Sequence, residues 1–164
     1  MTTQIKKTKS KKEDSLSLTK KLTKKLLDYL GSTSKVDVKK DEQNDAMVVD
    51  IQAGEDAGLL IGNRGRTLND IQAILGMIYK RRSGEWKRIV VDVSGWREKE
   101  TGRLNELAQQ TAERVKATGE SQPLYNLSPS QRRTVHMALA DEANIQTESH
   151  GEGEERYLLV SLKK

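Results

Sequence analysis

The sequence predicts an α+β chain with two small folded domains, over residues 15–95 and 96–164, behind a short polar tail. Segments in which apolar and polar residues alternate indicate strands, and segments with apolar residues at helical spacing indicate helices. These two patterns are interspersed along the chain, which is typical of an α+β fold. A hydrophobic content of 34% over 164 residues is modest for one packed core and fits two small cores better.

The first domain is expected to run in the order helix, strand, strand, helix, turn, helix, strand. Its helices show apolar stripes, and its strands show one buried face. The residues that establish these patterns are Leu18, Leu22, Leu26, Tyr29 and Leu30 for the first helix, Val36, Val38, Met47, Val49 and Ile51 for two strands, Leu68, Ile71, Leu75 and Ile78 for the last helix, and Ile89, Val91 and Val93 for the last strand.

The turn between the second and third helices is the tetrapeptide Gly62-Asn63-Arg64-Gly65, followed by Arg66. Glycine accepts positive φ and leaves the main chain bare, so this turn can bring backbone N–H groups against a phosphate. A plain interhelical turn would show the same glycine spacing, and taken alone the pattern favours that interpretation. The two arginines add positive charge beside the turn.

The helix that follows this turn has a recognisable start. Thr67 is expected to be its N-cap, with Asp70 three residues on, so that the positive end of the helix faces the same ligand. A Walker A nucleotide site is the other interpretation of this loop. It is excluded because Leu60 and Arg66 stand where that motif needs glycine and lysine.

The net charge of +5 is unevenly distributed. Residues 1–25 contain nine lysines and two acidic residues, whereas the rest of the chain has slightly more acidic than basic residues. Within that remainder, residues 64–88 hold seven basic and two acidic residues, which predicts a basic patch next to the tetrapeptide. The auxiliary basic members of this patch are Arg81, Arg82, Lys87 and Arg88.

Residues 1–14 lack hydrophobic periodicity and are expected to be a disordered Lys-rich tail, either solvated or a loose tether for a polyanion. The chain has no cysteine, and its two histidines lie fourteen residues apart, so no metal or cofactor is expected. No apolar run is long enough for a membrane span, and no secretory signal is present. A cytoplasmic protein without stable membrane insertion is expected.

The two tryptophans, Trp86 and Trp96, flank the last strand of the first domain. This placement favours packing over stacking on bases. Aromatic residues make up only 4% of the chain and phenylalanine is absent, so a sheet that stacks bases is not expected.

The second domain is expected to begin with a long helix, residues 96–118, which Gly119 ends. A further helix has a strong start, with Ser128 as N-cap, Pro129 at the first helical position and Gln131 closing a capping box. Two strands joined by a glycine-containing turn are predicted at residues 145–149 and 156–162.

On this further helix, Arg132 and His136 are four residues apart and share one face. The histidine can either hydrogen-bond a phosphate or hold the helix against the sheet, and the sequence leaves both roles open. The guanidinium of Arg132 is the better phosphate ligand because its planar fork matches an oxyanion. Arg133 is an added basic candidate.

The order of elements over residues 16–94 resembles a type II KH domain, a three-stranded sheet with helices on one face. The resemblance implies that the GxxG loop clamps about four nucleotides of single-stranded RNA or DNA. The second half resembles an R-three-H domain, a small α/β domain whose Arg-x-x-x-His motif matches Arg132 and His136. It implies binding of single-stranded nucleic acid, and Gln131 stands where bacterial members often have glutamate. The segments that carry this second resemblance are Ser128–His136 and Thr147–Tyr157.

The two domains in tandem resemble the bacterial Jag family, also called SpoIIIJ-associated proteins, across residues 16–164. The Lys-rich tail stands where many members carry a Jag-N domain. The resemblance implies a cytoplasmic RNA-binding regulator linked to cell elongation and division, often paired with a small KH-only protein. A homodimer is the other partner arrangement considered.

The expected function is therefore non-catalytic binding of single-stranded RNA, with two weak sites acting on one strand. An enzyme is not expected, because no nucleophile with a base and no histidine pair on one helix is found. The alternative is a scaffold that docks a protein partner through the KH sheet or the long helix. The acidic residues that could have suggested a hydrolase, and that fit solvated helix faces and ends instead, are Glu98, Glu100, Asp141 and Glu142.

Overall fold

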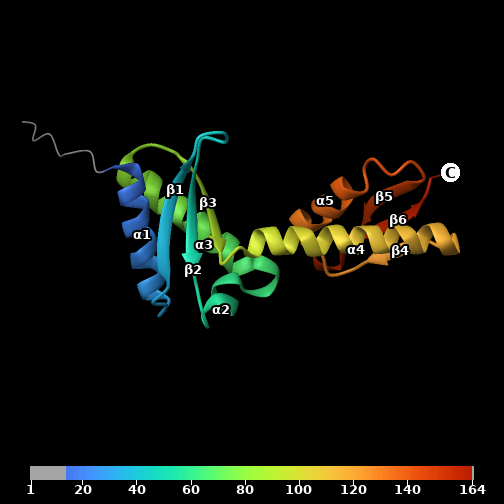
Figure 1. Ribbon diagram of the computed structural model, residues 1–164, viewed down its shortest axis with the longest axis horizontal. Helices are drawn as coiled ribbons and strands as arrows, with labels where there is room; N and C mark the ends of the chain where they lie inside the picture. Colours follow the sequence, from blue (N-terminus) through green and yellow to red (C-terminus); the bar gives the residue numbers. More distant parts are fainter. Residues whose placement is uncertain (1–13, 164) are drawn as a thin grey trace, which may run out of the picture. The chain divides into compact units, whose positions relative to one another are not determined.

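The computed structural model of the protein describes residues 14–163, which form two compact units (Figure 1). The chain passes from the first unit to the second at Ser94–Gly95. The predicted Lys-rich tail lies outside the described residues, apart from Asp14. Among residues 14–163, no helix combines the length and the apolar character needed to cross a membrane.

The first unit is a three-stranded sheet with helices packed on it. The sheet order is β1-β2-β3, with β1 and β2 antiparallel and β2 and β3 parallel. A parallel pair needs a long crossover, and the two helices between β2 and β3 supply it. The elements are α1 (Ser15–Tyr29), β1 (Lys35–Asp41), β2 (Ala46–Gln52), α2 (Ala57–Ile61), the 3-10 turn η1 (Asn63–Gly65), α3 (Arg66–Ser83) and β3 (Arg88–Val93).

The predicted strands of this unit are confirmed, and alternate residues of β2 and β3 are buried, including Val49, Ile51 and Val91. The apolar stripe predicted for α1 is wrong by about one position. Its fully buried line includes Thr19 and Thr23, whose hydroxyls donate to the carbonyls one turn earlier. Because these bonds satisfy the hydroxyls, threonine can occupy buried positions that the sequence pattern assigned to leucine.

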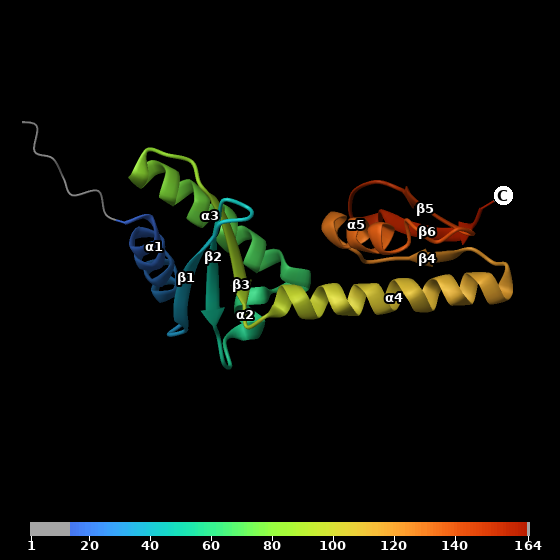
Figure 2. The ribbon, with the colours of Figure 1, turned by 45° about the horizontal axis from the view of Figure 1, so that its top comes forward.

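The second unit has two helices and a three-stranded antiparallel sheet, in the order β4-β6-β5 (Figure 2). The predicted long helix and its end at Gly119, which adopts φ 73°, are confirmed. The sequence did not predict β4, because a three-residue strand that contains proline shows no periodicity. The elements are α4 (Trp96–Thr118), β4 (Gln122–Leu124), α5 (Pro129–Ala138), β5 (Ile145–His150), the 3-10 turn η2 (Gly153–Glu155) and β6 (Tyr157–Leu162).

One hydrophobic cluster joins the helices of this unit to one face of its sheet. Leu104 and Val115 of α4, Val135 of α5, and Leu158 and Val160 of β6 are among its buried members. Since successive strand residues point to opposite faces, the residues that alternate with Leu158 and Val160 lie on the face away from this cluster.

Candidate nucleic-acid interface

The GxxG loop, Gly62–Gly65, joins α2 to α3 through an unusual backbone path. Gly62, Arg64 and Gly65 all adopt positive φ, at 69°, 55° and 76°. An L-residue rarely adopts this conformation, so Arg64 is held there by its surroundings. The side chains of Asn63, Arg64 and Arg66 are exposed. The loop therefore presents its polar residues to solvent, as the sequence predicts.

Gly62 is required by the packing of the loop. A Cβ at this position would lie 2.7 Å from Thr67 Cβ and closer still to its hydroxyl. The expected role of Thr67 as N-cap is wrong, because α3 begins at Arg66 with Gly65 in the cap position and no side-chain cap bond. The 3-10 turn brings the chain into the helix two residues earlier, so Thr67 lies inside the first turn and packs against Gly62.

The loop has fewer bare amides than the glycine spacing suggested. Gly62 N donates to Gly58 O at 2.9 Å, and Arg66 N donates to Asn63 O. Gly65 N lies 3.5 Å from Gly62 O. Among residues 14–163, no acceptor is found for the amides of Asn63 and Arg64, which makes these two the candidate donors to an anion.

The basic patch predicted next to the loop is divided by α3. Arg81 and Arg82 lie in the last turn of that helix, whereas Arg66 begins it (Figure 1). Sixteen residues of helix separate Arg66 from Arg82, which is about 24 Å at 1.5 Å per residue. Lys87 and Arg88 follow that far end, where hydrogen bonds from Asn44 and, to a smaller extent, the charge of Arg88 lower the pKa of Asp41. The four auxiliary residues are therefore remote from the loop.

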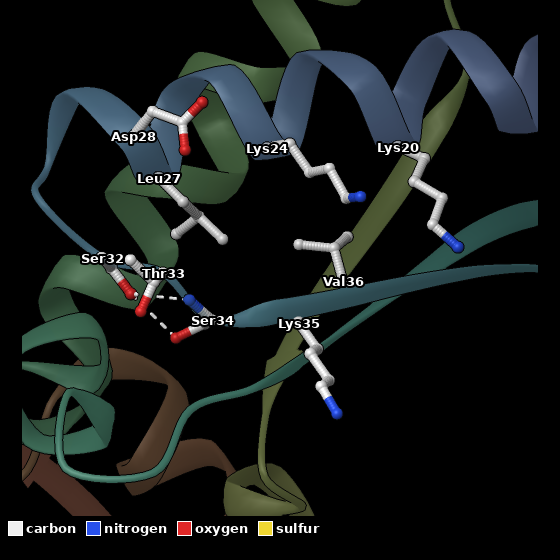
Figure 3. Close-up of a pocket in the computed structure, with 9 residues that line it drawn as sticks. All are labelled: Lys20, Lys24, Leu27, Asp28, Ser32, Thr33, Ser34, Lys35 and Val36. Atoms are coloured by element: carbon white, nitrogen blue, oxygen red, sulfur yellow. Dashed lines mark hydrogen bonds between the residues drawn. The ribbon is translucent and has the colours of Figure 1, made fainter.

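A second basic surface lies on α1, whose lysines belong with those of the tail to the basic residues 1–25. Four of the nine lysines of residues 1–25 belong to this helix. Lys20 and Lys24 line a cleft of about 490 Å³ between α1 and the start of β1, with Leu27 and Val36 between the two elements (Figure 3). The i, i+4 spacing of these lysines was the sequence feature that could have revealed a basic helix face.

The expectation that both tryptophans pack is wrong for Trp86, whose side chain is 70% exposed. Trp86 lies in the connection between α3 and β3, outside both elements. Trp96, at the start of α4, is half-buried.

In the second unit, the start of α5 is built as predicted. Gln131 N donates to Ser128 Oγ, and Ser128 N donates to Gln131 Oε1 at 2.8 Å. The amide of Gln131, which is only 4% exposed, also donates to Glu100 Oε1 at 2.6 Å. Hydrogen bonds from Arg103 and Gln131 outweigh burial and lower the pKa of Glu100. A glutamate at position 131 would place two carboxylates side by side, so glutamine suits the contact with Glu100 better.

The Arg-x-x-x-His residues are both engaged with the rest of the unit. Arg132 is half-buried, and its Nη1 donates to Leu127 O at 2.8 Å and to Arg156 O at 3.4 Å. His136 Nδ1 shares a hydrogen bond with Thr147 Oγ1 of β5. The histidine is nevertheless exposed, so holding the helix to the sheet leaves part of its ring accessible to a ligand. Arg133 is exposed.

Two family sequence patterns match the chain, one for each unit. Residues 17–93 match the KH domain of KhpA/KhpB, and residues 103–162 match the R-three-H domain. Together these two ranges cover most of the described residues.

Three curated bacterial relatives carry the name RNA-binding protein KhpB. The Clostridium symbiosum protein is 32% identical over 139 residues, the Bacillus subtilis protein 39% over 113, and the Lactiplantibacillus plantarum protein 33% over 107. These matches cover 85%, 68% and 65% of this chain. The chain spans 62%, 54% and 33% of the length of these relatives. With a KhpA/KhpB-type KH domain followed by an R-three-H domain, the chain belongs to the bacterial Jag family.

Proposed function

We propose that the protein binds single-stranded RNA without catalysing a reaction, and that each unit supplies one contact with the sugar-phosphate backbone. In the first unit the contact is the GxxG loop with Arg66, and in the second it is Arg132, Arg133 and His136. The observation that carries the proposal is the exposed, positive-φ loop with two available amides and two arginines. Two matched domain types and relatives named as RNA-binding proteins support it.

Two weak contacts on one strand reinforce each other, because the second binding step becomes intramolecular. We extend the proposal to a cytoplasmic post-transcriptional regulator connected with cell elongation and division. A small KH-only protein or a second copy of this chain is the proposed partner. Single-stranded DNA is a further ligand of the same chemistry, and the domain limits 15–95 and 96–164 are proposed for the two modules.

The test is the double variant Asn63→Asp, Arg64→Asp, measured by anisotropy with a labelled single-stranded RNA. Aspartate tolerates the left-handed conformation of residue 64, so the loop keeps its shape while its charge is reversed. We expect affinity to fall by at least about tenfold and the salt dependence to weaken. A control with the same charge change, Gln109→Glu with Arg114→Glu on the exposed face of α4, should retain most of the affinity.

Unchanged RNA affinity in the folded loop variant would contradict the proposal and favour the protein scaffold. The described long helix is a poor docking surface, because its exposed face is rich in charged residues such as Glu98, Lys99 and Arg103. The better apolar surface is on α3, where Ile74 is exposed and Met77, one turn later, is 65% exposed. Charged residues at these two positions would abolish scaffold binding and leave RNA binding intact.

A further inference from the structure

Three rings lie in a row across the second sheet. His150 of β5 and Tyr157 of β6 are register partners, with ring centroids 5.8 Å apart. Tyr125 directly follows Leu124, whose register partner is Leu158, and its ring centroid is 5.0 Å from that of Tyr157. The row therefore crosses all three strands at one end of the sheet, where β4, β6 and β5 lie side by side (Figure 2).

This row lies on the sheet face away from the hydrophobic cluster. Leu158 and Val160 point into the cluster, so Tyr157 points to the other face, together with its register partner His150. Tyr125 is 59% exposed. Of the six aromatic residues of the chain, Tyr79 alone is fully buried, at 2% exposure. Tyr125 is thus one of three aromatic residues, with Tyr29 and Trp86, that the fold leaves exposed.

The row adjoins Arg132 of the R-three-H motif. The Nη1 atom of Arg132 binds the carbonyls of Leu127 and Arg156, which lie two residues from Tyr125 and one residue from Tyr157. Between Tyr125 and Leu127, Asn126 turns the chain with φ 60°. The same guanidinium thus fixes both backbone segments that carry the tyrosines.

We propose that Tyr125, Tyr157 and His150 form a stacking surface for unpaired bases of the bound strand. This inference rests on the proposed function. Every base has a flat π-face, so stacking on aromatic rings adds affinity with little sequence preference. Arg132, which is bonded to both tyrosine-bearing segments, then holds a phosphate of the same nucleotides. This proposal departs from the expectation drawn from the low aromatic content, because it depends on where three rings lie and not on how many the chain has.

The competing explanation is that the rings only shield the end of the sheet. Leucine separates the two explanations, because it retains apolar bulk but has no ring on which a base can stack. The variants are Tyr125→Leu, Tyr125→Phe and Tyr157→Leu, with Tyr29→Leu in the other unit as the matched control, since Tyr29 is 77% exposed. Tyr125 is the primary site because a substitution at so exposed a position changes the stability of the fold little.

The experiment compares the full chain on two labelled twelve-residue oligonucleotides, one of adenosine and one with the same phosphates but no bases. The wild type should bind the adenosine strand more tightly. Tyr125→Leu should lower that base-dependent preference about fivefold or more, while affinity for the abasic strand stays within about twofold. Tyr125→Phe and Tyr29→Leu should retain the preference. Tyr157→Leu should act like Tyr125→Leu if its thermal midpoint is that of the wild type.

Two results would overturn the stacking surface. One is a wild type that binds the two strands equally, and the other is a Tyr125→Leu variant that keeps the full preference for bases. A wild type that binds neither strand would instead refute RNA binding itself, and the stacking surface with it. The two failures are thus distinguishable in one set of titrations.

Discussion

The two units hold their candidate phosphate contacts in opposite ways. In the KH unit the backbone conformation sets the position of the contact, since three of the four residues of the GxxG loop adopt positive φ. The side chains of Asn63 and Arg64 are exposed to solvent. In the R-three-H unit the backbone is an ordinary helix. Its motif side chains are instead tied to the fold, Arg132 to two carbonyls and His136 to Thr147.

This difference decides how a loss of binding should be interpreted. Removing the Arg64 side chain takes away a ligand contact and little else, so binding falls while stability stays. Removing the Arg132 side chain also leaves carbonyls without their donor, and stability falls with binding. A binding defect in the second unit identifies a contact only when stability is measured on the same variant.

The largest expected effect is that of Gly62→Ala. The new Cβ would collide with Thr67 in a backbone conformation that already penalises L-residues. We expect a loss of about 2 to 4 kcal/mol in the free energy of unfolding of the first unit, with loss of RNA binding, measured by urea denaturation and anisotropy.

The matched control for this variant is Gly58→Ala, one turn earlier in α2. No atom lies within 4 Å of a Cβ built there. This change should be neutral or stabilising by up to about 1 kcal/mol, because alanine favours helix. If the two substitutions lowered the stability equally, Gly62 would be under no special steric constraint. The contrast between the GxxG loop and the R-three-H helix would then be wrong.

The next effect is the contrast between Arg132→Ala and Arg133→Ala. Arg132→Ala should cost about 1 to 2 kcal/mol of stability, because Leu127 O and Arg156 O lose a charged donor. Arg133→Ala should stay within about 0.5 kcal/mol, since that side chain is exposed. Each substitution should lower the slope of log affinity against log salt concentration by the amount that corresponds to about one phosphate contact. If the stabilities proved equal, the anchored-motif description of the R-three-H unit would be wrong.

Most of the fold could be predicted from the sequence because its strands and long helices have one buried face. The capping box of α5 was also predictable, since Ser128, Pro129 and Gln131 act within one turn. The failures were of another kind. The start of α3 before Thr67, the position of the α1 stripe and the contact between the rings of Tyr125 and Tyr157 depend on residues that only the fold brings together. Arg66 and Arg82 belong to one basic stretch of the sequence. The stretch is a helix, however, so its two ends lie far apart in space.

The smallest expected effect concerns Gln131 and Glu100 and probes how firmly α5 is tied to α4. The pKa of Glu100 lies below its ordinary value of 4.5, chiefly because of the hydrogen bond from Arg103 and partly because of Gln131. Its ionised form therefore contributes stability above about pH 4.5, and this contribution is lost as the pH falls through the folded pKa.

Gln131→Glu replaces the donor with a second carboxylate and should cost about 1 kcal/mol at pH 7. The deficit should shrink below about pH 4.5, because one of the two carboxyl groups then takes up a proton and can donate to the other. The exchanged pair Glu100→Gln with Gln131→Glu should recover most of the loss, since the donor and acceptor have only traded places. The remaining deficit is the partly exposed ion pair with Arg103, worth less than about 1 kcal/mol. A Gln131→Glu deficit that does not change with pH would show that the loss comes from packing at the start of α5 and not from charge.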